Sequence, residues 1–161
     1  MTLSENKYDI QWDTPDGNRE HKAMVRKMFN EPRNRLLCKI FIKIYMEHPI
    51  SSSGLIKSMI SNQIHLNKDV AHTALTKLMN YGLVNKKTIT ELDDSELDMR
   101  IRLRHKEFLT YLPVPFKSRY DFINYYYVND YGEDFVPFVA KNLGLKVGDK
   151  NDSSKNVSED T

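Results

Sequence analysis

The sequence predicts a mainly α-helical fold with a small β-hairpin, which places the chain in the α+β class. Apolar residues recur at helical spacing over residues 33–47 and 67–81. Residues 83–90 and 99–104 have strand-like patterns, and a short acidic, turn-prone segment separates them. A length of 161 residues, with 40% hydrophobic and 29% charged residues, is typical of one globular domain with extensions.

Residues 1–32 form an N-terminal arm and a short helix in this interpretation. Tyr8, Ile10 and Trp12 alternate with polar residues, which favours a short strand or a docked arm. Residues 14–17 (TPDG) predict a turn. Apolar residues at helical spacing then predict a helix over residues 19–30, which stops before Pro32.

The segment 33–47 has the strongest helical pattern in the chain, with a wide apolar stripe made of Leu36, Leu37, Ile40, Phe41, Ile44 and Tyr45. Pro49 ends it, because the residue before a proline is pushed out of helical geometry. Residues 50–53 (ISSS) predict a short extended piece and a helix N-cap, and residues 55–60 predict a second helix.

A third helix is predicted over residues 67–81, with Asn67 as its N-cap. Its buried stripe comprises Ala71, Leu75, Leu78 and Met79. Gly82 stands where a helix ends in a left-handed residue, and Leu83-Val84 begins a strand. The opposite face carries small polar and basic side chains, which is unlike an ordinary solvated surface.

The predicted order is helix, short strand, helix, turn, helix, strand, long loop, strand. With the spacing of Leu66, Leu75 and Leu78 before Gly82-Leu83-Val84, this order resembles the winged helix-turn-helix superfamily, and most of all its MarR and ArsR groups of transcriptional regulators. The resemblance covers residues 33–106, which are therefore taken as the DNA-binding domain. The alternative is a winged helix that serves as a protein-interaction module of a transcription or replication assembly.

The resemblance implies that the helix over residues 67–81 enters the major groove of double-stranded DNA. The superfamily's base-reading positions fall on Lys68, His72 and Thr73, and the helix contributes flanking contacts from Asn67, Thr76 and Lys77. Near the base of the predicted hairpin, phosphate contacts are expected from Lys86, Lys87 and Arg102.

The charge distribution supports a polyanionic partner. Residues 33–90 contain nine Lys or Arg against two Asp or Glu, although the whole chain has a net charge of only +2. Residues 91–98 (ELDDSELD) carry five acids, and residues 99–106 (MRIRLRHK) carry four bases. Acids at the tip of the hairpin are repelled by phosphates, so the tip is expected to point away from DNA.

Residues 107–147 form an aromatic-rich extension with predicted helices over residues 118–130 and 134–143, the latter with Asp134 as N-cap. Tyrosines are favoured at interfaces, so the extension predicts a homodimer. A chain truncated after Lys106 is then expected to remain a folded monomer. Residues 148–161 are nearly free of apolar residues, which predicts a disordered tail.

Several function classes lack support in the sequence. Lysines interrupt the longest apolar run, which excludes a membrane span, and the N-terminus lacks a signal-peptide pattern. Cys38 is the single cysteine, which favours the cytoplasm and gives no support to a metal site. Catalytic and phosphate-loop motifs are absent, so we expect neither enzymatic activity nor a cofactor. The sequence leaves any effector ligand open.

Overall fold

The computed structural model describes residues 15–93, 95–110 and 123–145. The predicted arm before residue 15 and the predicted tail over residues 148–161 lie outside this part. Helices and strands follow in the order α1 (Pro15–Asn30), the 3-10 helix η2 (Pro32–Asn34), α2 (Arg35–Glu47), β1 (Ile50–Ser51), α3 (Ser52–Ser61), α4 (Lys68–Asn80), β2 (Val84–Lys87), the 3-10 helix η3 (Ile89–Glu91), α5 (Glu96–Thr110), β3 (Tyr125–Val128), α6 (Asp130–Glu133) and α7 (Val136–Asn142). The described part is therefore mostly helical, with one small sheet.

The predicted helices between residues 33 and 81 are confirmed, and their ends follow from local chemistry. The Ser51 hydroxyl accepts a hydrogen bond from the Gly54 N–H and caps α3. The Asn67 side chain accepts one from the Val70 N–H and caps α4. After α4, Gly82 has a φ of 79°, which is the left-handed conformation expected of a helix-terminating glycine.

The prediction of a strand over residues 99–104 is wrong, because these residues lie inside α5. The alternation of Met99, Ile101 and Leu103 suggested a strand, but only Ile101 of the three is buried. The buried residues of α5 are Asp98, Ile101 and His105, which are spaced by three and four residues and share one helix face. The predicted hairpin is therefore absent, and β2 continues into η3 and α5.

The prediction of a helix over residues 118–130 is also wrong where the structure describes it, because residues 125–128 form β3. Three tyrosines and a valine in a row suit a strand, since aromatic and β-branched side chains pack well on a pleated surface. Tyr126 pairs with Ile50 of β1 on one side and with Lys86 of β2 on the other, both antiparallel. The sheet order is β1-β3-β2, with β3 in the centre.

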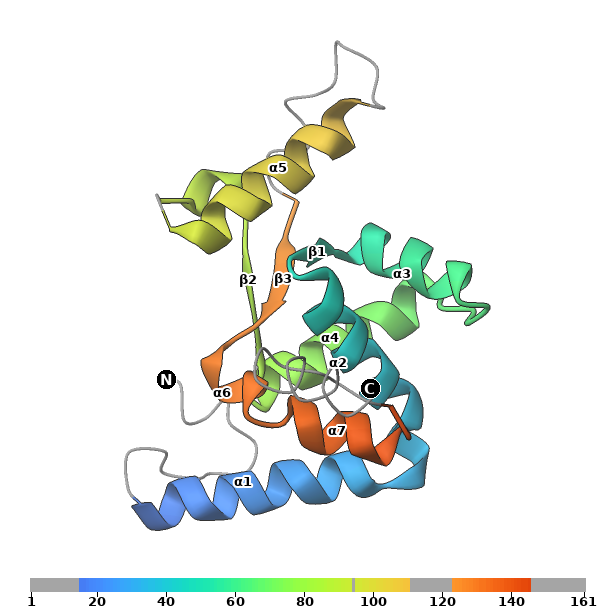
Figure 1. Cartoon of the computed structure of the whole chain (residues 1–161), viewed down its shortest axis with the longest axis vertical. Helices are drawn as coiled ribbons and strands as arrows, with labels where there is room; N and C mark the ends of the chain where they lie inside the picture. The colour runs from blue at the N-terminus through green and yellow to red at the C-terminus, as the bar shows by residue number, and fades with distance from the viewer. Residues whose placement is uncertain (1–14, 94, 111–122, 146–161) are drawn as a thin grey trace, which may run out of the picture.

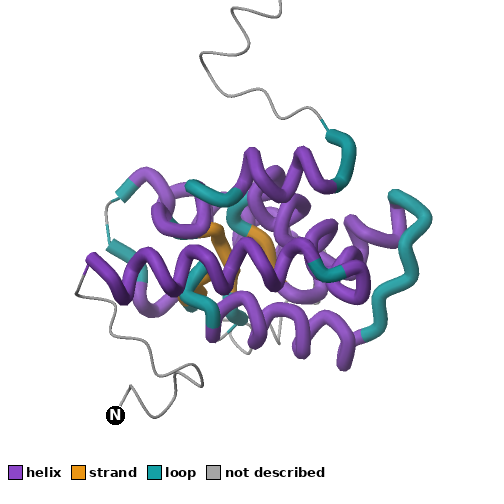
Figure 2. The backbone as a smooth tube through the Cα atoms, turned by 90° about the horizontal axis from the view of Figure 1, so that it is seen from below, coloured by secondary structure: helices purple, strands orange, loops and turns teal. Residues whose placement is uncertain are grey.

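The helices surround this sheet, and Figure 2 shows the strands enclosed among them. One cluster of buried apolar residues runs from Val25 of α1 to Ala140 of α7 and includes Tyr126 and Val128 of β3. In Figure 1, α1 and α7 lie together at the end of the molecule opposite α5. The predicted domain boundaries at residues 32 and 106 therefore cut through a single core.

The two terminal helices differ in detail from their predictions. The predicted turn over residues 14–17 is wrong from Pro15 onward, since α1 begins there. At the other end α7 begins at Val136, with Phe135 rather than Asp134 as its N-cap and with Pro137 in its first turn. Side chains join the C-terminal ends of α1 and α7, because the Asn142 amide donates a hydrogen bond to the Asn30 side chain (2.7 Å).

Candidate nucleic-acid interface

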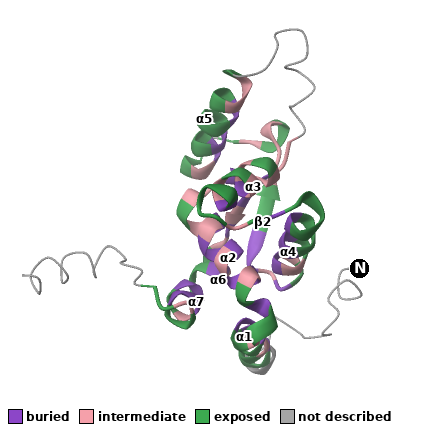
Figure 3. Ribbon diagram, turned by 90° about the vertical axis from the view of Figure 1, so that its right-hand side faces the viewer, coloured by how far each residue is buried: buried purple, intermediate pink, exposed green. Residues whose placement is uncertain are grey.

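The helix α4 has one face in the core and one face in solvent. Its buried residues are Ala71, Ala74, Leu75 and Leu78. The two alanines are short, so α4 can pack closely against α3 and α2, with which it makes contacts. Figure 3 shows this division, with the buried side turned toward α2 and β2 and the exposed side turned outward. The outer face is therefore held on a rigid support.

The outer face gathers most of the residues predicted to contact DNA. Lys68, His72, Thr73 and Thr76 are exposed, and Lys77 is half-buried. A shallow hollow of about 370 Å³ lies along this face and is lined by His72, Thr73, Thr76, Lys77, Asn80 and Tyr81. These side chains present hydroxyl, imidazole, amide and ammonium groups, which form hydrogen bonds with base edges and phosphates.

Lys77 is positioned by a neighbouring helix. Its ammonium group donates a hydrogen bond to the Asn34 side-chain oxygen (3.3 Å), and the Asn34 amide donates to the Met28 carbonyl (2.8 Å). The end of α1, the short helix η2 and α4 are thereby joined at one point. A lysine held in place loses less conformational entropy on binding a phosphate than a free lysine does.

A second hollow beside α4 adds a residue that the sequence prediction missed. It has a volume of about 300 Å³ and is lined by Arg33, Leu36, Leu37, Ile40, Asp69, Val70, Thr73 and Ala74. Thr73 lines both hollows, so Arg33 lies beside the predicted reading face. Arg33 belongs to the basic segment over residues 33–90, and that charge count was the signal that could have identified it.

Asp69 is the one acidic residue on this part of α4. It lies in the first helical turn, where a carboxylate interacts favourably with the positive end of the helix dipole. Asn67 is exposed, but its side-chain oxygen is engaged in capping the helix. Asn67 therefore retains its amide N–H groups for an external acceptor.

The remaining predicted contacts lie away from this face. Lys86 is exposed on β2. Arg102 is exposed on α5, which Figures 1 and 3 show at the opposite end of β2 from α4. The structure therefore brings together the six predicted residues on and beside α4, and it separates Arg102 from them.

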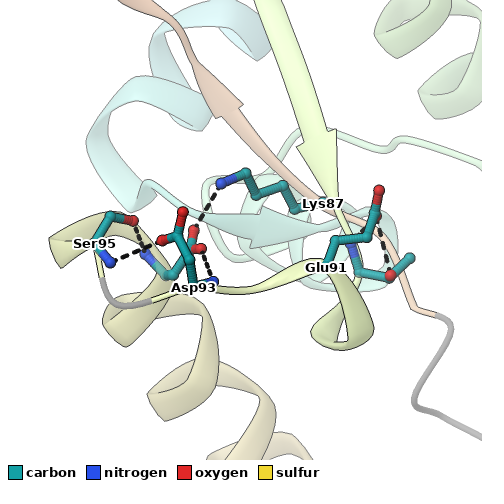
Figure 4. A network of polar contacts seen from close by, with 6 residues as sticks. Lys87, Glu91, Asp93 and Ser95 are labelled. Carbon is teal, nitrogen blue, oxygen red and sulfur yellow. Dashed lines mark hydrogen bonds and ion pairs between the residues drawn. The ribbon is translucent and has the colours of Figure 1, made fainter.

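Lys87 is committed to an internal ion pair. Its ammonium group lies 3.0 Å from a carboxylate oxygen of Asp98, whose side chain is fully buried. The other oxygen of Asp98 accepts a hydrogen bond from the Asp93 N–H. Figure 4 shows Lys87 reaching toward this turn while Asp93 and Ser95 close it. This network fixes the start of α5 against β2.

The network governs the ionisation of Asp98. Burial alone would raise the pKa of this carboxyl, but the hydrogen bonds from the Asp93 N–H and from Lys87 outweigh burial and lower the pKa to about 2. The hydrogen bond to Asp98 in turn raises the pKa of Lys87. Both groups are charged at neutral pH, which suits a structural ion pair better than a phosphate contact.

The described residues also bear on the predictions about a metal site, Cys38 and a membrane span. Among the described residues, no three His, Cys, Asp or Glu side chains are grouped closely enough to hold a metal ion. Cys38 is buried, and its thiol donates to the Phe29 carbonyl. None of the helices in the part that the structure describes has the length and apolarity to cross a membrane.

Comparisons with protein-family models, with curated proteins and with solved structures gave no match for the chain.

Proposed function

We propose that this protein is a sequence-specific, double-stranded-DNA-binding protein of the winged-helix kind, and that it acts in the cytoplasm as a dimeric transcriptional regulator. The helix α4 is the reading element, and it enters the major groove. The outer face of α4 carries this proposal, because it gathers Lys68, His72, Thr73 and Thr76 in solvent on a support of buried alanines and leucines.

The order of elements supports the same proposal. The sequence α2, β1, α3, α4, β2, β3 retains the predicted order of helices and strands, with β3 in the place of the predicted second hairpin strand. The helix α5 is then an insertion between the last two strands. The acidic residues Glu91, Asp93 and Glu96 lie at the start of this insertion, away from α4.

Binding to duplex DNA as a function of salt tests the proposal. We expect the affinity for a duplex to fall steeply with salt, with a log–log slope of about −4 or steeper, because several lysines and arginines displace counterions from phosphates. Fluorescence anisotropy with labelled duplexes measures this slope. An affinity that does not change between low and physiological salt would contradict the proposal.

The second candidate function is a winged-helix protein-interaction module of a transcription or replication assembly. The observation that favours it is on α5, where Met99 and Leu103 are large apolar side chains in solvent. If no duplex binds even at low salt, this second candidate replaces the first.

A further inference from the structure

The outer face of α5 has a pattern that DNA binding does not explain. Met99 is 57% exposed and Leu103 is 60% exposed, and they lie one helical turn apart. Glu96 precedes Met99 by three residues and Lys106 follows Leu103 by three, and both are exposed. The spacing of three, four and three residues places all four side chains in one stripe, the seam by which helices pair in coiled coils.

This stripe lies opposite the buried face of α5. The buried face is attached to the body through Asp98, which binds Lys87, and through His105, whose ring lies 2.9 Å from the Tyr125 hydroxyl. Arg104 adds a hydrogen bond to the Glu47 carbonyl. The helix is therefore fixed on one side, and Figure 3 shows it exposed along the other.

We propose that this stripe, which we call the α5 seam, pairs with the α5 seam of a second copy of the chain, with the two helices antiparallel. In such a pair Met99 faces Leu103 of the second copy. Three residues further from the two-fold axis on each helix, Glu96 lies opposite Lys106 of the second copy. The two-fold axis repeats each contact, so the pair contains two apolar contacts and two ion pairs.

The charge distribution favours a second copy over a different partner. The N-terminal end of α5 and the turn before it carry exposed Glu91, Asp93 and Glu96. The rest of the helix carries one exposed acid, Glu107, and four exposed bases, Arg100, Arg102, Arg104 and Lys106. Glu96 also forms an ion pair with Arg100 of its own helix (2.9 Å). An antiparallel pair places the acidic end of each copy against the basic end of the other. A uniformly acidic protein or a nucleic acid would match only the basic half and would be repelled by the acidic end.

The seam is short, so the dimer is expected to be weak. One pair of helices of this length buries less surface than a standard stable interface. Arg100 and Arg102 lie on the two edges of the seam next to the two-fold axis, where they approach the same arginines of the second copy, which further limits the affinity. We expect dissociation in the micromolar range or above. This inference rests on the proposed homodimer, for which the α5 seam is the interface. Dimerisation through the seam is tested in the absence of DNA.

Charge exchange tests the register. Glu96→Lys and Lys106→Glu each convert two attractive contacts into two repulsive ones, so each variant alone should dimerise at least about tenfold more weakly than the parent. Lys106→Glu is the cleaner of the two, because Glu96→Lys also removes the ion pair between Glu96 and Arg100 within the helix. An equimolar mixture of the two variants restores attraction at both contacts and should form a heterodimer. Native mass spectrometry, with one variant labelled with heavy nitrogen, measures the three species at a protein concentration on the order of 100 µM.

A matched pair of variants separates the seam from general surface effects. Leu103→Ser should weaken the dimer, whereas Met46→Ser, which changes an exposed apolar residue on α2, should leave it unchanged. Circular dichroism confirms that each variant is folded. A parent chain that is monomeric at this concentration, or variants whose mixture gives no heterodimer, would overturn the proposal. A parent chain that dimerises but binds no duplex DNA would instead contradict the proposed role of α4 in DNA binding.

Discussion

At the scale of single residues, the proposed DNA contacts of α4 divide into side chains expected to read bases and side chains expected to hold phosphates. Thr73 and His72 face the shallow hollow on α4, with short polar groups suited to base edges. Lys68 lies at the start of the helix as a long cation. The two kinds of contact predict different consequences of substitution.

We expect Lys68→Ala to weaken binding to all duplexes alike and to reduce the salt slope by about 1. His72→Ala and Thr73→Ala should instead change which sequences are preferred, because they remove hydrogen bonds to bases. Selection from a random duplex library measures the preference. If the His72 and Thr73 variants select the same sequences as the parent chain, α4 does not read bases with this face. Lys141→Ala, an exposed lysine on α7, is the matched control for charge.

The buried Asp98 gives the second residue-scale prediction. Its pKa is lowered to about 2 in the folded protein and lies near 3.8 for an ordinary aspartate. The unfolded chain therefore binds this proton more tightly, so Asp98 stabilises the fold above about pH 4, and this contribution is lost as the pH falls toward 2. Asp98→Ala should lower the free energy of unfolding at neutral pH by about 1–3 kcal/mol.

Denaturant unfolding at a series of pH values measures both effects. The parent chain should lose stability between about pH 4 and pH 2, and Asp98→Asn should lose less over the same interval because an amide does not titrate there. Glu107→Gln, an exposed carboxyl on the same helix, is the control and should follow the parent. Equal pH dependence of the parent and Asp98→Asn would show that protonation of Asp98 does not cause the loss of stability at low pH.

At the scale of elements, the helices between residues 33 and 81 were predictable because each has apolar residues at helical spacing, and α3 and α4 also have capping residues, Ser51 and Asn67. The segment over residues 99–104 was not, because six residues of strict alternation satisfy a strand pattern while Ile101 also belongs to a helical stripe with Asp98 and His105. A pattern of apolar residues does not reveal that Asp98 and His105 are buried, because both side chains are polar. Their partners, Lys87 and Tyr125, are known only once the chain is folded.

The candidate site was predictable to the extent that it lies on one helix. The residues on α4 follow from the resemblance to the winged helix-turn-helix superfamily, and helical spacing explains why they share one face. Arg33 was missed because it reaches the site from another helix. Lys87 was assigned to phosphate contact because Asp98 was placed in a hairpin loop, where no buried ion pair was expected.

The central position of β3 reverses the expected outcome of truncation. A chain that ends at Lys106 loses the strand that joins β1 to β2, together with the buried Phe135, Val136 and Val139. We expect this chain to show no cooperative thermal unfolding. A chain that ends at Leu145 retains every described element and should keep the parent's transition. Cooperative unfolding of the shorter chain would show that residues 25–106 suffice for a core.

At the scale of the whole molecule, α1 is held to the C-terminal elements by a buried pair. The ring of His21 lies 2.5 Å from the Tyr131 hydroxyl, and His21 is fully buried. Burial lowers the pKa of His21 to about 4 and raises the pKa of Tyr131 to about 12. Both groups are neutral at pH 7, so the contact between α1 and α6 is sensitive to acid.

The pair predicts a second pH interval that is separate from that of Asp98. The unfolded chain protonates His21 near pH 6.5 and the folded chain near pH 4, so stability is complete above about pH 6.5 and declines as the pH falls toward 4. His21→Gln should flatten this decline, and His65→Gln, at an exposed histidine, should not. Thermal unfolding between pH 7 and pH 4.5 measures the difference. A parent chain with constant stability over this interval would contradict the assignment.

The strand order also has a consequence for synthesis of the protein. Ile50 of β1 has its partner at Tyr126, so neither outer strand can pair with β3 until residues 125–128 have left the ribosome. At about 5–20 residues per second, β1 waits roughly 4–15 s for that partner. During this time α2 has emerged without β3 and α7, which it contacts in the folded protein. The nascent chain therefore has a long interval in which a chaperone can bind it, and completion of the sheet depends on the translation of β3.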